Sequence, residues 1–192
     1  MKVHFTYSHF FVAALLPGCF FIASCTNPDK EIQAMNSKQI GVEEAKDVAI
    51  DYSISGKTKA KLTEPYMLRH EESVPFIEFT KTVHTNFFDD TLGVESWLDA
   101  RYARYMETES KIFLKDSVRL INRNGDTLYS DELYWDRSRT GHEFYTDKPV
   151  RIRTRTEILN GVGFESNMDF KNWSMKNLVN SEVRIPSTQF PQ

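Results

Sequence analysis

A short alternating pattern of apolar and polar residues recurs along the stretch from Gly93 to Phe164, and no other feature constrains the fold as strongly. The corresponding positions are Trp97, Ala100 and Tyr102, then Leu128, Asp131 and Leu133, then Ile158, Gly161 and Gly163, with an earlier copy at Ala60, Thr63 and Pro65. A unit that repeats in this way cannot bury its apolar face alone and stacks on its neighbours. The sequence therefore predicts an all-β fold built from repeated hairpins.

The first strand is expected at Val48 to Ile54, where apolar residues alternate with polar or small ones. Further strands are expected at residues 57–63, 76–80, 83–88, 94–105, 112–121, 126–135, 144–154 and 157–164. Because proline cannot donate to a ladder, we expect the second strand to end at Pro65 or to lie at an edge there. Asn124-Gly125 separates two of these runs and predicts a hairpin with a type I′ turn.

The first 24 residues are typical of a secretory signal, with one lysine, no acidic residue and a short apolar run. They end in Ile22-Ala23-Ser24-Cys25, which is similar to a bacterial lipobox and predicts lipidation of Cys25. Cleavage before Cys19 is the rival interpretation, and a disulfide or a retained membrane anchor is the plainer alternative for both cysteines. We therefore expect a signal peptide at residues 1–24, a flexible tether at 25–44, a β-stack at 45–177 and a polar tail at 178–192.

The composition excludes several classes of function. A chain of 192 residues suits one folded domain, and its net charge of −3 does not provide the basic face that a nucleic-acid partner needs. We find no glycine-rich phosphate loop, nucleophile elbow or paired histidines at helical spacing. The sequence therefore predicts a protein that is not an enzyme and that uses no cofactor and no metal.

Three polar groups are candidates for a site. His70-Glu71-Glu72 lacks the spaced further ligands of a metal site and is interpreted as a solvated loop. Asp89-Asp90, followed by Gly93, is interpreted as turn chemistry. The basic residues Lys148, Arg151, Arg153 and Arg155 form either a solvated outer face or a contact for an anionic headgroup or an acidic partner, and both interpretations stay open.

The strands also carry enough apolar residues to line one long face. Those residues are Leu62, Val83, Phe87, Trp97, Val118, Leu120, Leu128, Val150, Ile152, Ile158 and Phe164. They form either the core of an ordinary sandwich or the lining of an apolar groove that shields lipid chains. The residues alone do not decide between these two alternatives.

Several motifs, in this order and spacing, resemble the LptC family, the periplasmic component of the lipopolysaccharide export ABC transporter, here in a lipoprotein form. They are the lipobox, the run from Gly93 to Ala103, Gly125-Asp126-Thr127-Leu128-Tyr129, Leu133-Tyr134-Trp135, and Gly161-Val162-Gly163-Phe164-Glu165-Ser166. The resemblance covers Val48 to Asn177. It departs from the best-known form of the family, which begins with a transmembrane helix where this chain has a lipidation motif.

The resemblance implies a single twisted, open antiparallel β-jellyroll, or taco, of the kind shared with LptA and OstA-like domains. It implies that acyl chains of lipopolysaccharide bind in the apolar groove and that the protein bridges the permease periplasmic domains of the transporter to an LptA-like protein. The strand near Val48 to Ile54 would serve the transporter side, and those near Ile158 to Asp169 the LptA side. The protein would be lipid-anchored at the periplasmic side of the inner membrane.

A second hypothesis is a membrane-anchored β-sandwich lipoprotein that binds protein or glycan through exposed aromatic residues, of which Tyr102, Tyr105, Tyr129 and Trp135 are the candidates. A third, an envelope hydrolase, has no supporting motif.

Overall fold

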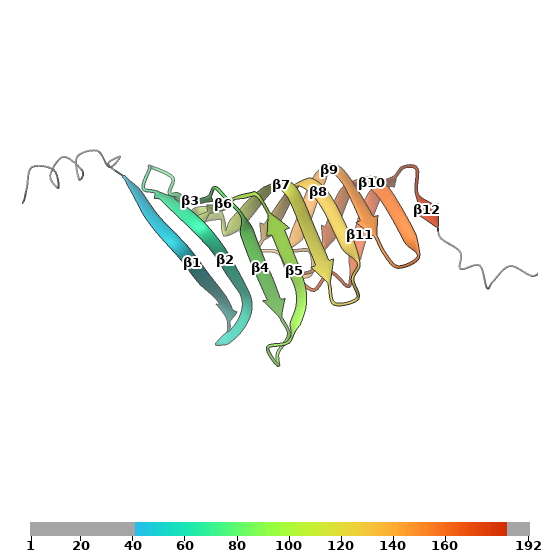
Figure 1. The fold of residues 1–192 in the computed structure, drawn as a ribbon, viewed down its shortest axis with the longest axis horizontal. Helices are drawn as coiled ribbons and strands as arrows, with labels where there is room; N and C mark the ends of the chain where they lie inside the picture. The colour runs from blue at the N-terminus through green and yellow to red at the C-terminus, as the bar shows by residue number, and fades with distance from the viewer. Residues whose placement is uncertain (1–40, 184–192) are drawn as a thin grey trace, which may run out of the picture. The chain divides into compact units, whose positions relative to one another are not determined.

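The structure is a computed structural model that describes residues 41–183, and in this part of the chain the protein is an all-β, twisted antiparallel sheet (Figure 1). The strands are β1 (Val42–Ile54), β2 (Lys57–His70), β3 (Phe76–Phe79), β4 (Val83–Phe88), β5 (Val94–Ala100), β6 (Tyr102–Met106), β7 (Lys111–Asn122), β8 (Thr127–Asp136), β9 (Phe144–Arg153), β10 (Glu157–Ser166), β11 (Trp173–Leu178) and β12 (Glu182–Val183), with a 3-10 turn, η1 (Glu107–Glu109), before β7. The predicted all-β class is confirmed. The predicted signal peptide, Cys19, Cys25 and the tail beyond Val183 lie outside the described residues.

The sheet folds into two walls because its long strands cross from one wall to the other. In β2, residues 60–63 pair with β4, whereas residues 67–70 pair with β3. In β7, residues 119–122 pair with β5, whereas residues 111–115 pair with β6. The front wall therefore contains β4, β5 and the halves of the long strands beside them, and the back wall contains β3, β6 and the other halves. Figure 1 shows β4 and β5 in front of β3 and β6.

The line along which the strands bend, here called the crease, is marked by irregular backbone. Asp47 has φ 52°, Asp116 and Ser117 have φ 63° and 58°, and Gly163 has φ 82°. The register shifts between Lys115 and Val118 and again beside Gly163. Extra residues of this kind bend a strand and increase its twist. The crease is thus a row of bulges, one beside the next, that turns the sheet back on itself.

Two predicted boundaries are wrong, and the crease explains both. Strand β2 does not end at Pro65 but continues to His70, because Pro65 lies between the residues that pair with β4 and those that pair with β3. The expected strand at 94–105 is two strands, β5 and β6, which separate at Arg101. The amide of Arg101 donates to the carbonyl of Asp116 on the bulge of β7, at 3.0 Å.

The ends of the fold extend beyond the predicted limits. Strand β1 begins at Val42, inside the segment expected as tether, because residues 42–46 pair with residues 66–70 of β2 in the back wall. At the other end, β11 runs to Leu178 and β12 pairs with residues 157–158 of β10, so ordered strands extend into the segment expected as a tail.

The hairpin at Asn124-Gly125 is confirmed, but its turn type differs from the prediction. Gly125 has φ 86°, whereas Asn124 does not have the positive φ that a type I′ turn requires. The amide of Gly125 donates to the carbonyl of Asn122 at 2.9 Å, and the Asn122 side chain accepts from the amides of Asn124 and Asp126. This is a type I turn that closes with a left-handed glycine.

The Asp89 carboxylate organises the β4–β5 turn, as predicted. Its Oδ1 accepts hydrogen bonds from the Thr91 hydroxyl at 2.7 Å and from the amides of Gly93 and Thr91 at 2.8 Å each. These bonds, from Thr91 first, hold the pKa of Asp89 well below its ordinary value. Across the turn, Arg123 pairs with the other oxygen of Asp89 at 3.1 Å, which ties this hairpin to the β7–β8 turn.

One buried carboxylate at the crease is poorly satisfied. Glu64 is 5% exposed, its Oε2 accepts from the amide of Tyr66 at 3.2 Å, and its Oε1 has no partner among the described residues. Burial raises the pKa of Glu64, against the lowering effect of the Tyr66 amide. The raised pKa means that the folded state favours the protonated form, so Glu64 reduces stability as the pH rises through its folded pKa.

We therefore expect Glu64→Gln to stabilise the protein at pH 7 to 8 by about 1 kcal/mol, or a rise of about 2–4 °C in Tm. The gain should vanish below the ordinary glutamate pKa, because Glu64 is then neutral in both states. Thermal unfolding followed by circular dichroism across this pH range measures the difference, with the exposed Glu72→Gln as control. A lower Tm of Glu64→Gln at neutral pH would contradict this account.

Candidate functional site

The space between the walls is lined by inward-facing apolar side chains. Nine of the eleven predicted residues lie there, each at most 6% exposed: Leu62, Val83, Phe87, Val118, Leu120, Leu128, Val150, Ile152 and Phe164. Their strands come from nearly the full length of the sheet, from β2 to β10. The structure therefore brings these residues together in one continuous apolar interior.

Trp97 and Ile158 do not join this interior. Trp97 lies between Ser96 and Leu98, which are both buried, so it occupies the opposite, outer face of β5. Ile158 alternates with Leu159, and it is Leu159 that packs against the core. In both places two apolar residues are adjacent in sequence, and period-2 alternation cannot tell which of them points inward.

The predicted residues describe only half of the interior. Except for Phe164, all of them belong to the front wall, and the facing residues of the back wall were missed: Phe79, Ala103, Ile112, Leu114, Leu133, Trp135 and Phe144. Ile112 and Leu114 alternate correctly within β7, but Asp116 and Ser117 then shift the register before Val118. A break in the alternation inside a long strand was the signal that could have revealed the second wall.

Aromatic rings connect the two walls. Phe87 of the front wall packs edge-on against Trp135 and Phe144 of the back wall, with ring centroids 5.0 and 5.3 Å apart. Tyr52 of β1 packs edge-on against Trp135 at 5.8 Å. Edge-to-face pairs at these distances contribute beyond the area that they bury. The interior is thus closed and tightly packed in this conformation.

A small apolar cavity remains at the β1 end of the interior. Its lining residues are Ile50, Tyr52, Ala60, Leu62, Phe79, Tyr105, Ile112, Trp135 and Arg137, and its volume is about 50 Å³. At its rim the Arg137 guanidinium lies over the rings of Tyr52 and Tyr105, at 4.9 and 4.8 Å. The indole N–H of Trp135 is buried and has no acceptor among the described residues. The cavity therefore offers hydrocarbon contacts, and the unpaired indole N–H belongs to one of its lining residues.

A larger cavity, of about 1450 Å³, lies on the outer face of the front wall beside the crease. It follows a cross-strand row in which His84, Asp99, Arg119, Tyr129 and Arg151 are successive partners. Asp99 bonds to both His84 and Arg119, at 2.7 and 3.0 Å. This outer groove has a mixed lining, in which the Asp99 pairs lie beside apolar residues such as Pro149 and Val162.

The aromatic surface of the β-sandwich hypothesis does not form. Trp135 is 3% exposed, and Tyr105 packs against the core. The Tyr102 hydroxyl donates to Glu78 at 2.5 Å. Of the four candidate residues, only Tyr129 is an exposed large side chain, at 37%.

His70 also differs from its prediction as part of a solvated loop. It is the last residue of β2, stacks on Phe76 with centroids 4.3 Å apart, and bonds to Glu78 at 3.1 Å. Burial opposes ionisation of Glu78, but the bonds from Tyr102 and Arg104 outweigh it and lower the pKa of Glu78. In the part of the chain that the structure describes, no group of three or more potential metal ligands lies close together.

The basic residues of β9 lie on the outer face, as the alternation along this strand predicts. Arg151 and Arg153 are exposed on the outer face of β9, opposite the buried Val150 and Ile152, and Arg155 is exposed in the following turn. Arg151 lies 5.9 Å from the ring of Tyr129. Lys148 pairs loosely with Asp147 and Glu132, at 3.7 and 4.0 Å.

Both ends of the sheet present strand edges. Strand β1 pairs only with β2 in the described part of the chain, so one edge is free along Val42–Ile54. At the other end, β11 and β12 both pair with β10. Free edges of this kind are templates for the addition of another strand.

These features define a class of protein: an open, two-walled antiparallel β-jellyroll with an apolar interior and strand edges at both ends. The chain belongs to the family described as lipopolysaccharide-assembly, LptC-related, whose family model matches residues 10–183. A comparison with curated proteins gave no match.

Membership of this family implies a role in lipopolysaccharide transport, with lipopolysaccharide and the Lpt machinery as partners. The family is a non-enzymatic transport component, and it suggests a place at the periplasmic face of the inner membrane. Among residues 41–183, no helix is long and apolar enough to cross a membrane.

Proposed function

We propose that the protein takes the acyl chains of lipopolysaccharide between its two walls and passes them along the interior. One observation carries this proposal: the inward faces of both walls are apolar from β2 to β10, while strand pairing joins the walls only across the crease in the described residues. The side opposite the crease, here called the open side, holds the hairpin turns. A trough of this construction can open there without breaking a ladder.

Acyl chains require the walls to separate. The cavity of about 50 Å³ is far smaller than a lipid chain, and the other lining residues are fully packed. Burial of hydrocarbon is worth about 0.8 kcal/mol per methylene, so a chain of about ten methylenes gains on the order of 8 kcal/mol. This gain can offset the contacts between the walls that the chain replaces. The free N–H of Trp135 would then donate to an ester or amide carbonyl of the lipid.

The strand edges support the bridging part of the proposal. The free edge of β1 would add a strand from the periplasmic domains of the transporter permease, and the edge at β10–β11 would add one from an LptA-like protein. The apolar interior reaches the β1 edge, because Ile50 and Tyr52 line the small cavity there. A neighbour that pairs with β1 would therefore extend the trough.

Lipidation of Cys25 belongs to the same proposal. An acyl-modified cysteine would hold the protein at the periplasmic side of the inner membrane, and the residues between Cys25 and Val42 would serve as its tether. Cys25 lies outside the described residues, and the rival cleavage before Cys19 is tested by mass spectrometry of the mature protein.

Binding of lipopolysaccharide should depend on its acyl chains. We expect intact lipopolysaccharide to bind the full chain and to change the emission of Trp135, whereas the same polysaccharide after removal of its acyl chains should not bind. Titration of both ligands in one detergent, with Trp97→Phe and Trp173→Phe to remove the other two tryptophan signals, measures this difference. Equal binding of the deacylated polysaccharide would contradict the proposal.

A further inference from the structure

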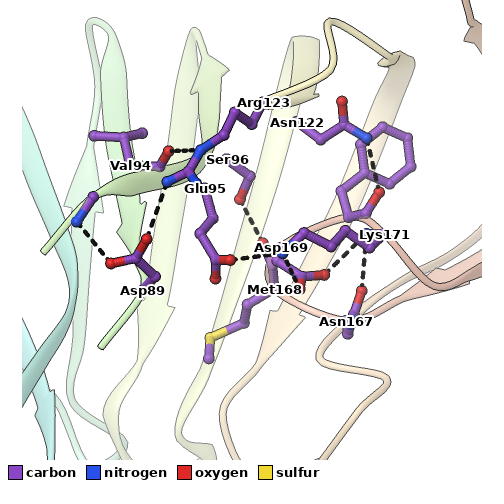
Figure 2. Close-up of polar contacts among 12 residues, drawn as sticks. Asp89, Val94, Glu95, Ser96, Asn122, Arg123, Asn167, Met168, Asp169 and Lys171 are labelled. Atoms are coloured by element: carbon purple, nitrogen blue, oxygen red, sulfur yellow. Dashed lines mark hydrogen bonds and ion pairs between the residues drawn. The ribbon is translucent and has the colours of Figure 1, made fainter. Parts of the chain in front are cut away.

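The segment Asn167–Asn172, between β10 and β11, reaches β5 and β7 at the open side of the trough, and Figure 2 shows its polar contacts. It leaves β10 in the back wall and bonds to the front wall at two buried side chains. The Ser96 hydroxyl of β5 donates to the carbonyl of Met168 at 2.5 Å, and the Asn122 amide of β7 donates to the carbonyl of Phe170 at 3.1 Å. Ser96 and Asn122 are 0% and 3% exposed. The segment thus connects the walls on the side where no strand pairing joins them.

Phe170 turns from this segment into the interior. Its side chain is 0% exposed and packs edge-on against Phe164 with ring centroids 5.8 Å apart. Its backbone has φ 52°, a left-handed conformation that is unfavourable for a bulky residue. Strain of this kind persists only where the surroundings enforce it, and it is concentrated at functional positions. Phe170 is therefore held inside the trough against the preference of its own backbone.

Met168 also packs, half-buried, against the core, and the other contacts of the segment are internal or at the surface. The amides of Lys171 and Asn172 donate to the side chain of Asn167, at 3.2 and 3.1 Å, so the segment keeps its own shape. The Lys171 ammonium pairs with Glu95 of β5 at 2.6 Å and with Asp169 at 3.2 Å, and the side chain of Lys171 is 51% exposed. Exposed pairs hold little free energy. The segment can leave the front wall as a unit by losing one buried ring, the half-buried packing of Met168, two buried hydrogen bonds and one surface ion pair.

We propose that Asn167–Asn172 is a built-in plug: Phe170 fills the part of the interior beside Phe164 that an acyl chain occupies when lipid is bound, and entering lipid displaces the segment. An aromatic ring and a hydrocarbon chain suit the same apolar space, so they compete for it. Without lipid, the plug covers apolar surface that water would otherwise reach. This inference rests on the proposed function, because it requires that acyl chains enter between the walls.

Displacement has a signature that a merely structural loop lacks. If lipid replaces Phe170, addition of lipopolysaccharide should speed hydrogen exchange at residues 167–172, although ligands usually protect the segments that they contact. In the Phe170→Ala protein no ring has to be displaced, so a larger fraction of the protein is already able to bind lipid. We therefore expect it to bind lipopolysaccharide about tenfold more tightly. Lys171→Ala loosens the same segment from the surface and should shift affinity in the same direction by a smaller factor.

The test uses the full chain in detergent, with lipopolysaccharide as the ligand and Phe113→Ala, which removes an aromatic ring on the outer face of β7, as the matched control. Faster exchange at 167–172 and tighter binding by Phe170→Ala and Lys171→Ala, but not by Phe113→Ala, are the expected results. Binding of lipopolysaccharide with unchanged or slower exchange, and with no gain for either plug variant, would overturn the plug and leave the proposed function standing. If lipopolysaccharide binds none of the proteins, the proposed function itself is overturned.

Discussion

Replacing Phe87 by alanine is expected to lower the free energy of unfolding by about 3–5 kcal/mol, the range for loss of a buried phenylalanine. Phe87 is 2% exposed and contacts rings of the opposite wall, Trp135 and Phe144, so its removal leaves a cavity between the walls. Denaturant unfolding of the full chain, followed by circular dichroism, measures the change.

Phe113→Ala is the matched control for this prediction. Phe113 packs against Tyr134, with centroids 5.0 Å apart, on the outer face of the back wall. Because this pair is partly solvated, we expect a loss of only about 0.5–1.5 kcal/mol. An equal loss in the two variants would show that the contact between the walls is not the main source of stability, and the two-walled account would then be wrong.

A proline in the free edge of β1 is expected to reduce binding to the transporter by about tenfold or more, while lipid binding by the protein remains. In an antiparallel edge strand, successive residues direct their N–H groups alternately toward the neighbouring strand and toward the free edge. Of Ile50→Pro and Asp51→Pro, one therefore removes a bond to β2 and the other removes a donor from the free edge.

Thermal unfolding distinguishes the two proline variants, because loss of a bond to β2 lowers Tm. The variant that retains Tm is the one that should lose capture of the permease periplasmic domains in a pull-down. Lipopolysaccharide binding serves as its internal control. If that variant captures the permease domains as well as the unmodified protein does, then β1 is not the docking edge.

The strand pattern was predictable because period-2 alternation depends only on which residues face the core. It located nearly every strand, including β4 at Val83–Phe88 without error. The crease was not predictable in the same way. Proline in β2 usually ends a strand, and Asp116-Ser117 usually marks a loop, yet both lie inside continuous strands. The bends of neighbouring strands lie side by side along the crease. A sequence does not show directly which residues of different strands are aligned in this way.

The candidate site was predictable for one wall and not for the other. Alternation from the turns of the front wall finds Leu120, Leu128 and Ile152. In β7 the exposed Asp116 interrupts the buried positions before Leu114, and in β8 the phase itself changes before Leu133. Phe170 was missed for a different reason. It lies in a polar segment between strands, where an isolated aromatic residue carries no periodic signal, and its burial depends on hydrogen bonds from β5 and β7.

The central claim is that acyl chains travel between the walls, and neighbouring residues of β7 test it most directly. Leu120 faces the interior at 0% exposure, whereas Ile121 faces the outer side next to Trp97. A small diazirine amino acid placed at each position in turn, in cells that export lipopolysaccharide, reports what each side chain contacts. We predict lipopolysaccharide adducts at Leu120 and none at Ile121. Adducts at Ile121 alone, or at neither position while export continues, would contradict the account.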